Sequence, residues 1–121
     1  MLQRQPYQFA SPKTLIGIEV EVENILKIDP NLSLMFWLHK QDGSLRNNGI
    51  EFVTPGVLPV SLAESALVQL FTGLNPDIDF SHRTSIHVHV DVRGLTMEQL
   101  ITLLFVYTVV ENLLFKFAGS N

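Results

Sequence analysis

Ile18-Glu19-Val20-Glu21-Val22-Glu23 alternates apolar residues with carboxylates. Successive side chains of a β-strand point to opposite faces, so the apolar residues can enter a core while the three glutamates line the other face. Any half-solvated antiparallel strand shows the same alternation, so the pattern alone does not identify a site. It predicts a strand over residues 15–24 with one apolar face and one acidic face.

His87-Val88-His89-Val90-Asp91-Val92 repeats the alternation with imidazoles. We expect its three valines in the core and both histidines on the opposite face. Imidazole is a common metal ligand, and two on one face lie within reach of one site. Glu51, in the strand-like run 50–56, adds another carboxylate. If these strands share a sheet with their polar faces matched, the groups converge on a site for divalent cations and anionic substrates.

Length and composition set the outer bounds. The chain has 121 residues, of which 46% are hydrophobic, a net charge of −4 and no cysteine. These values predict one domain over residues 1–121. With only eight Lys and Arg residues, a nucleic-acid surface is not expected. Disulfides and thiolate zinc sites are excluded, and the N-terminal residues lack the apolar core of a signal peptide, so we expect a cytoplasmic protein.

Residues 100–117 are almost wholly apolar and approach the roughly 20 residues that a bilayer-spanning helix needs. Glu111 in the middle of the run argues against a membrane span. Thr96 with Gln99 three residues later predicts a capping box, and Gly119 predicts the helix end. We expect a long, deeply buried helix in which Glu111 either faces a polar pocket or pairs with a basic partner.

The remaining elements follow from turn and capping signals. Ser61 and Glu64 predict a capping box for an amphipathic helix that ends at Gly73. The other assignments are irregular chain over 6–15, a strand over 34–40 with Trp37 in the core, a turn at Asp42-Gly43, a strand over 48–54 and a loop over 75–83. This order predicts an α+β domain whose mostly antiparallel, curved sheet is backed by helices on one face and presents ligands on the other.

Four short motifs carry a family resemblance: Gly17-Ile18-Glu19-Val20-Glu21, Asp42-Gly43-Ser44-Leu45-Arg46, Glu51-Phe52-Val53-Thr54-Pro55 and His87-Val88-His89-Val90. In this order they resemble the carboxylate-amine ligases of the glutamine synthetase and glutamate-cysteine ligase superfamily, and most closely the amidoligases common in phages and their hosts. Members continue beyond the long helix, and that later part supplies a further metal carboxylate and arginines. The resemblance therefore implies that residues 1–121 are the N-terminal half of such a catalytic domain, as a fragment, one half of a split enzyme or a remnant of the fold.

The resemblance also implies a chemistry. Such ligases use ATP as a cosubstrate to phosphorylate a carboxylate, and an amine then attacks the acyl phosphate to give an amide or isopeptide bond. Two or three Mg²⁺ or Mn²⁺ ions bridge the phosphates. The metal ligands implied for this chain are Glu19, Glu21, Glu51 and His87, with His89 facing the carboxylate substrate or its acyl phosphate.

Four residues of the predicted loops are further candidates for contact with the nucleotide or the substrate. The resemblance implies that Asp42 and Ser44 lie beside the nucleotide and substrate, although Asp-Gly-Ser is also ordinary turn chemistry. Arg46 and Arg83 are candidates to steady phosphate or carboxylate oxygens, because a guanidinium fork suits both. Each can equally be a plain surface charge.

Two other functions remain open. The domain can be a catalytically incomplete, metal-stabilised binding or structural module of the same fold, whose long apolar helix packs against a partner in a larger assembly. It can also be a zinc hydrolase that uses His87, His89 and a glutamate, although the carboxylate-rich face favours hard cations. The expected partners are small-molecule or peptide carboxylates and amines, with an oligomer or completing chain possible, and neither nucleic acid nor membrane.

Overall fold

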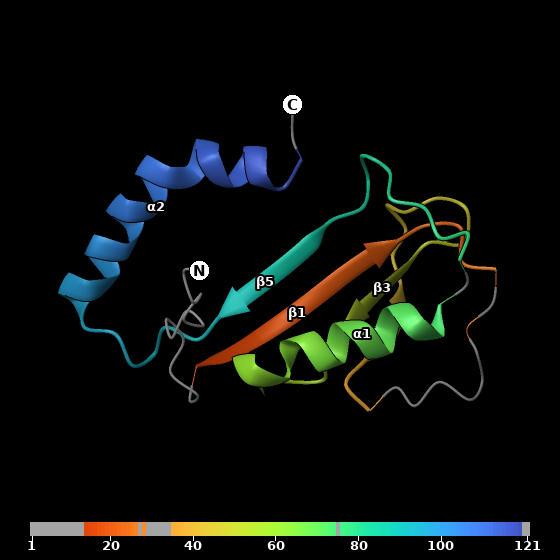
Figure 1. Ribbon diagram of the computed structural model, residues 1–121, viewed down its shortest axis with the longest axis horizontal. Helices are drawn as coiled ribbons and strands as arrows, with labels where there is room; N and C mark the ends of the chain where they lie inside the picture. The colour runs from red at the N-terminus through yellow and green to blue at the C-terminus, as the bar shows by residue number, and fades with distance from the viewer. Residues whose placement is uncertain (1–13, 27, 29–34, 75, 120–121) are drawn as a thin grey trace, which may run out of the picture. The chain divides into compact units, whose positions relative to one another are not determined.

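The computed structural model describes residues 14–26, 28, 35–74 and 76–119 (Figure 1). The predicted irregular chain before residue 14 and the start of the predicted strand at Leu34 lie outside these ranges. The described elements are β1 (Leu15–Val22), β2 (Leu38–Gln41), β3 (Ile50–Val53), β4 (Leu58–Pro59), the 3₁₀ turn η1 (Val60–Leu62), α1 (Ala63–Gly73), β5 (Ile86–Val90) and α2 (Met97–Phe117). The chain forms two compact units, one ending at Val90 and the other beginning at Asp91, and each is described by itself.

The sheet is built around β1, and every pairing in it is antiparallel. β5 pairs with one side of β1, whereas β3 and then β4 follow each other along the opposite side, and β2 pairs with β3. The predicted mixed α/β fold with an antiparallel sheet is confirmed. The strand expected over residues 15–24 is also found, because β1 alternates between half-buried and buried positions along its whole length.

The core lies on the apolar side of β1, where Ile18, Val20 and Val22 are almost wholly inaccessible. It is closed by α1, which contributes Ala66 and Leu70. In Figure 1, α1 lies along the sheet at β1 and β3. The burial of these apolar side chains is the main stabilising contribution in a domain of this size.

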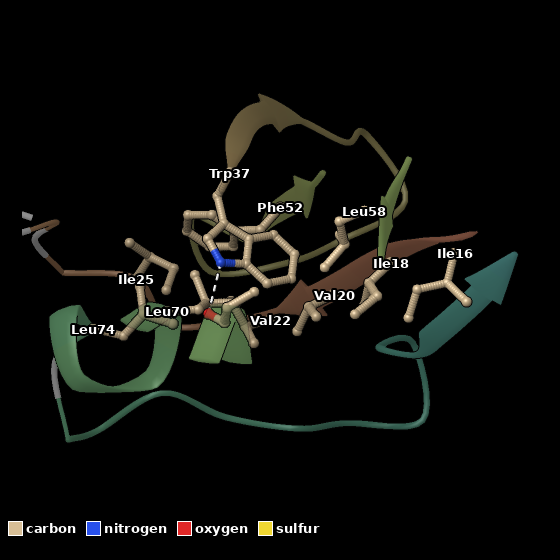
Figure 2. Close-up of a cluster of buried hydrophobic side chains, with 11 residues drawn as sticks. Ile16, Ile18, Val20, Val22, Ile25, Trp37, Phe52, Leu58, Leu70 and Leu74 are labelled. Carbon is tan, nitrogen blue, oxygen red and sulfur yellow. Dashed lines mark hydrogen bonds between the residues drawn. The ribbon is translucent and has the colours of Figure 1, made fainter. Parts of the chain in front are cut away.

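Trp37 fixes the position of α1 against the sheet. Its side chain is 1% exposed, and its ring nitrogen donates a hydrogen bond of 2.8 Å to the carbonyl of Ala66, marked by the dashed line in Figure 2. Phe52 of β3 belongs to the same cluster and is wholly buried. The hydrogen bond satisfies the single polar atom of the indole, so the ring can be buried without an unpaired donor. The prediction that Trp37 belongs to the core is confirmed.

The expected burial of the valines of β5 is wrong. Val88 and Val90 are more than half exposed, as is Ile86, and none of them belongs to the core cluster. All five residues of β5 are exposed, the histidines as well as the apolar residues. Within the described part of the unit that ends at Val90, the core cluster takes in β1, β3, β4 and α1 but not the apolar side of β5.

The start of α1 also differs from the prediction. Leu62 is the N-cap residue and makes no side-chain capping bond, so the Ser61–Glu64 capping box is not formed. The turn η1 precedes the helix, and the backbone N–H of Ala63 bonds to the carbonyl of Val60. A preceding 3₁₀ turn is a common way to begin an α-helix without a side-chain cap.

α2 begins and ends as the sequence predicts. The Thr96 side chain accepts from the backbone N–H of Gln99, and the Gln99 side chain accepts from the backbone N–H of Thr96. Gly119 follows the helix with a φ of 87°, a left-handed conformation that favours glycine. None of the residues of α2 is buried, so the expected deep burial is not found. Among the described residues, α2 is the one helix whose length and composition would allow it to cross a membrane, a test that core helices of soluble proteins also pass.

Candidate functional site

The candidate site is the side of the sheet opposite the core, here called the polar face. It carries Gly17, Glu19, Glu21, Lys40, Glu51, Ser85, His87 and His89. Strand register arranges most of these in two neighbouring rungs. In one, Glu19 lies opposite His87, and in the other Glu21 lies opposite Glu51, which lies opposite Lys40. Directly opposed residues of an antiparallel pair have Cβ atoms about 5 Å apart, so these side chains can interact.

Glu19 is held between the two histidines of β5. One of its carboxylate oxygens lies 3.0 Å from Nδ1 of His87, and the other lies 3.2 Å from Nε2 of His89. The Glu19 side chain is 28% exposed, whereas both imidazoles are more than half exposed. The hydrogen bond with His87 lowers the pKa of the Glu19 carboxyl. Partial burial of the carboxyl raises this pKa, and the electrostatic interaction with His89 lowers it, so the net shift is downward.

Ser85 joins the two rungs. Its hydroxyl donates to a carboxylate oxygen of Glu21 and lies 2.9 Å from Nε2 of His87. A serine hydroxyl has one proton, so Ser85 can only accept from His87 while it donates to Glu21. Although Ser85, His87 and Glu19 follow the order of a nucleophile, base and orienting carboxylate, the proton of Ser85 is directed away from the base. Ser85 therefore acts here as a tether between strands and not as an activated nucleophile.

Lys40 and Glu51 form an ion pair on the second rung. The distance from Nζ of Lys40 to Oε2 of Glu51 is 2.9 Å. The Glu51 side chain is 9% exposed, whereas that of Lys40 is 60% exposed. The hydrogen bond to Glu51 raises the pKa of the Lys40 ammonium, with smaller contributions from the charges of Glu19 and Asp42. Sequence reasoning did not place Lys40 in the site.

The carboxylate oxygens on the polar face are the donors that hard divalent cations prefer, whereas imidazole is more typical of sites for zinc, copper, iron and nickel. The register also fits, because the carboxylates and His87 occupy neighbouring positions on two rungs. The side chains as they stand are not grouped around an ion. Among the described residues, no three or more His, Asp or Glu side chains gather in a way that could hold one. The candidate ligands are bonded within the chain instead, Glu51 to Lys40, Glu21 to Ser85 and Glu19 to the histidines.

The predicted cosubstrate loop has ordinary turn geometry. The Asp42 carboxylate accepts from the backbone N–H of Ser44 at 2.8 Å, and this hydrogen bond lowers the pKa of Asp42. An open hollow of about 290 Å³ lies beside the loop, lined by Ile25, Gln41, Asp42, Gly43, Leu45, Asn48, Gly49 and Ile50. Asp42 can thus contact a ligand, whereas the Ser44 backbone is committed to the turn. Their cofactor role stays a prediction.

Both predicted arginines bond to neighbouring loops. The backbone N–H of Arg46 donates to Glu23 at 2.7 Å, and its guanidinium Nε lies 3.7 Å from the same carboxylate oxygen. Arg83 donates from its guanidinium to the carbonyl of Ser44 at 3.1 Å. The Arg83 bond connects the loop before β5 with the loop after β2, and the Arg46 bonds connect the loop after β2 with Glu23, just after β1. A role for either arginine in steadying substrate oxygens stays a prediction.

Two further acidic residues have structural partners. Glu23 is 1% exposed, and the pKa of its carboxyl is lowered, first by the hydrogen bond from the Arg46 backbone and then by Ser81. Asp91 forms an ion pair of 2.8 Å with Arg93, and the hydrogen bonds from Arg93 lower the pKa of Asp91 to about 2. Neither carboxylate is free to extend the acidic face. Sequence alternation could not distinguish Glu23 from Glu19 and Glu21, since burial at the end of β1 depends on the loops that cover it.

Comparison of the chain with protein-family models, with curated proteins and with solved structures finds no match. The amidoligase resemblance therefore rests on the four sequence motifs.

Proposed function

We propose that this protein is an ATP-dependent carboxylate-amine ligase, an amidoligase that forms an amide or isopeptide bond through an acyl phosphate. The observation that carries the proposal is the register of the sheet. Glu21 of the first motif lies opposite Glu51 of the third, and Glu19 lies opposite His87 of the fourth. Three motifs far apart in the sequence thus contribute to one face. A glutamine synthetase or glutamate-cysteine ligase-like catalytic domain, with this chain as its N-terminal half, is part of the proposal.

The polar face would hold the divalent cations through Glu19, Glu21, Glu51 and His87. When bound, Mg²⁺ or Mn²⁺ neutralises phosphate charge and aligns the attacking and leaving oxygens. Transfer of the γ-phosphoryl group of ATP to the substrate carboxylate would release ADP, and attack of the amine on the acyl carbon would then release phosphate. A cytoplasmic location fits this use of ATP.

His89 is the residue proposed to face the carboxylate substrate. It lies opposite Gly17, and a Cβ atom at Gly17 would come within 3.7 Å of both the His89 Cβ and the Thr54 hydroxyl. The missing side chain leaves space beside the imidazole for a small group to approach the sheet. The amine loses a proton as the amide forms, and an imidazole is a suitable acceptor when it lies within hydrogen-bond reach. Glu19 orients this imidazole through Nε2.

A second candidate function is a binding or structural module that keeps the fold without turnover. It is favoured by the apolar side of β5, where Ile86, Val88 and Val90 are all more than half exposed. The same function is favoured by the hydrogen bonds and ion pairs that Glu19, Glu21 and Glu51 form with other side chains of this protein.

Calorimetric titration of MnCl₂ into the 121-residue chain, with and without a non-hydrolysable ATP analogue, tests the proposal. A Glu19→Gln, His87→Ala double variant removes ligands from the first rung, and Glu64→Gln, an exposed glutamate on α1, is the matched control. We expect Mn²⁺ binding that the analogue strengthens, that the double variant loses and that the control retains. Absence of Mn²⁺ binding in the wild type, beside a defined oligomer or stable complex, would favour the structural module instead.

A further inference from the structure

The loop between β2 and β3 contains two consecutive asparagines followed by a glycine, Asn47-Asn48-Gly49. The pairing of the two strands ends at Gln41 and Ile50, so this segment lies outside the β-ladder. Asn48 is exposed, and its φ of 56° is left-handed, a conformation that asparagine adopts more readily than most residues. Within the described residues, no hydrogen bond of the Asn48 side chain is recorded. Its amide group is therefore open to reaction.

The packing of this loop requires glycine at the position after Asn48. A Cβ atom at Gly49 would clash with the Cβ of Leu45 and would lie 3.0 Å from the carbonyl oxygen of Arg46. Glycine also has the least hindered backbone nitrogen, because no side chain lies beside it. The packing that excludes a larger residue at position 49 thus keeps an unhindered backbone nitrogen next to the Asn48 amide.

We propose that Asn48 is a site of spontaneous deamidation, and that its product loosens the packing of Gly49 against Leu45. The backbone nitrogen of Gly49 attacks Cγ of Asn48 and forms a bond to it. The side-chain amino group takes up the proton of that nitrogen and leaves as ammonia, which closes a succinimide ring. Water then opens the ring at either carbonyl and gives an aspartyl or an isoaspartyl residue. This inference is independent of the proposed ligase activity, because water is the only co-reactant.

The isoaspartyl product changes the main chain of the loop. The chain then runs through Cβ of residue 48 and is longer by one carbon atom, about 1.5 Å. Gly49 packs directly against Leu45, and the pairing of β3 with β2 begins at the next residue, Ile50, so the extra length has to displace Gly49. Either product also adds a negative charge to the hollow that Asp42 and Asn48 both line. We therefore expect the product to be less stable than the unmodified protein.

Asn24 is a matched internal control. Its φ of 61° is left-handed like that of Asn48, but it is followed by the buried and β-branched Ile25. A β-branched side chain shields its own backbone nitrogen. The Asn24 side chain also donates a hydrogen bond of 2.7 Å to the carbonyl of Asp77. Asn24 should therefore keep its amide under conditions in which Asn48 loses it.

The test is to age the 121-residue chain at mildly alkaline pH in water enriched in heavy oxygen and to analyse its peptides by mass spectrometry. We expect loss of the amide and uptake of heavy oxygen at Asn48 and not at Asn24. Fragmentation of the peptide distinguishes an aspartyl from an isoaspartyl residue. A sample kept at mildly acidic pH is the unaged reference.

Urea unfolding measures the consequence for the loop. The aged wild type should have a lower unfolding midpoint than the unaged protein. Asn48→Gln should keep its midpoint on ageing, because its longer side chain would have to close a larger and less favoured ring. Asn48→Asp carries the new charge without the longer main chain, so its midpoint should lie between those of the unaged and the aged wild type.

The inference is overturned if Asn48 keeps its amide on ageing, if Asn24 loses its amide as fast, or if Asn48→Gln loses as much stability on ageing as the wild type. An aged wild type that contains isoaspartate at residue 48 and still unfolds at the unaged midpoint would overturn the proposed loosening of the loop.

Discussion

Glu21 and Glu51 lie directly opposite each other on neighbouring strands, with their side chains on the face of the sheet that points away from the core. Two carboxylates in this position repel each other unless a positive group or hydrogen-bond donors are present. Ser85 donates to Glu21 and Lys40 pairs with Glu51, so each carboxylate has a separate partner. The pair is therefore stable as it stands.

Glu21→Gln should weaken Mn²⁺ binding while the fold remains intact. The amide keeps the shape of the side chain but loses the charge, and even indirect partners of a bound metal typically contribute roughly tenfold to affinity. We expect a loss of roughly tenfold or more, measured by calorimetry. The unfolding midpoint should stay unchanged or rise, because the repulsion with Glu51 is removed.

Glu64→Gln is the control for this change, because Glu64 is exposed on α1 and absent from the polar face. It removes the same charge without touching the two rungs. Equal Mn²⁺ affinity in Glu21→Gln and Glu64→Gln would remove Glu21 from the set of ligands.

Much of the fold was accessible from local sequence patterns. Alternation over residues 15–24 identified β1 and assigned its two faces, and Thr96 with Gln99 identified the start of α2. The same capping pattern at Ser61 and Glu64 gave a wrong prediction for α1. The turn η1 precedes this helix, and a backbone hydrogen bond takes the place of a side-chain cap. The short strand β4 could not be predicted, since it exists through its pairing with the first residues of β1.

The candidate site was predictable in its residue types but not in its pairings. Carboxylates and histidines were identified by alternation, whereas Lys40 depends on the register between β2 and β3. Residues 42–49 separate the paired Gln41 and Ile50, and a connection of that length does not fix a register from sequence. Ser85 had a signal, because extending the alternation back from His87 places it on the same face.

Trp37→Phe should destabilise the unit that ends at Val90. The change removes the donor to the Ala66 carbonyl and leaves a cavity where the larger ring was, which together should cost about 2–3 kcal/mol. Urea unfolding followed by circular dichroism measures it, since Trp37 is the sole tryptophan and fluorescence is lost with it. Phe80→Leu, at a half-exposed aromatic residue, should cost less than about 1 kcal/mol. Equal costs for the two variants would contradict the anchoring role of Trp37.

Gly49→Ala should be destabilising, whereas Gly43→Ala in the same loop should not. A Cβ atom at Gly49 would clash with the Cβ of Leu45, whereas nothing lies within 4 Å of a Cβ at Gly43. Overpacking of this kind typically costs about 1–3 kcal/mol, while alanine at a compatible glycine stabilises by about 0.4–1 kcal/mol. The measurement is the urea midpoint of each variant. A Gly49→Ala protein as stable as Gly43→Ala would show that the loop adjusts freely.

Glu23 should make stability depend on pH in the acidic range. Its folded-state pKa is lowered below the ordinary value of 4.5, first by the hydrogen bond from the Arg46 backbone. A carboxyl with a depressed folded pKa contributes stability that is fully present above the unfolded value and is lost as pH falls through the folded value. The free energy of unfolding of the wild type should therefore decline as the pH is lowered below about 4.5.

Glu23→Gln keeps an acceptor for the Arg46 N–H but not the charge, so it should be less stable at pH 7 and converge on the wild type in acid. Urea unfolding from pH 7 to pH 3, with Glu64→Gln as the exposed control, measures this difference. A constant gap between Glu23→Gln and the wild type over that range would mean that Glu23 stabilises the loops by shape and hydrogen bonding alone.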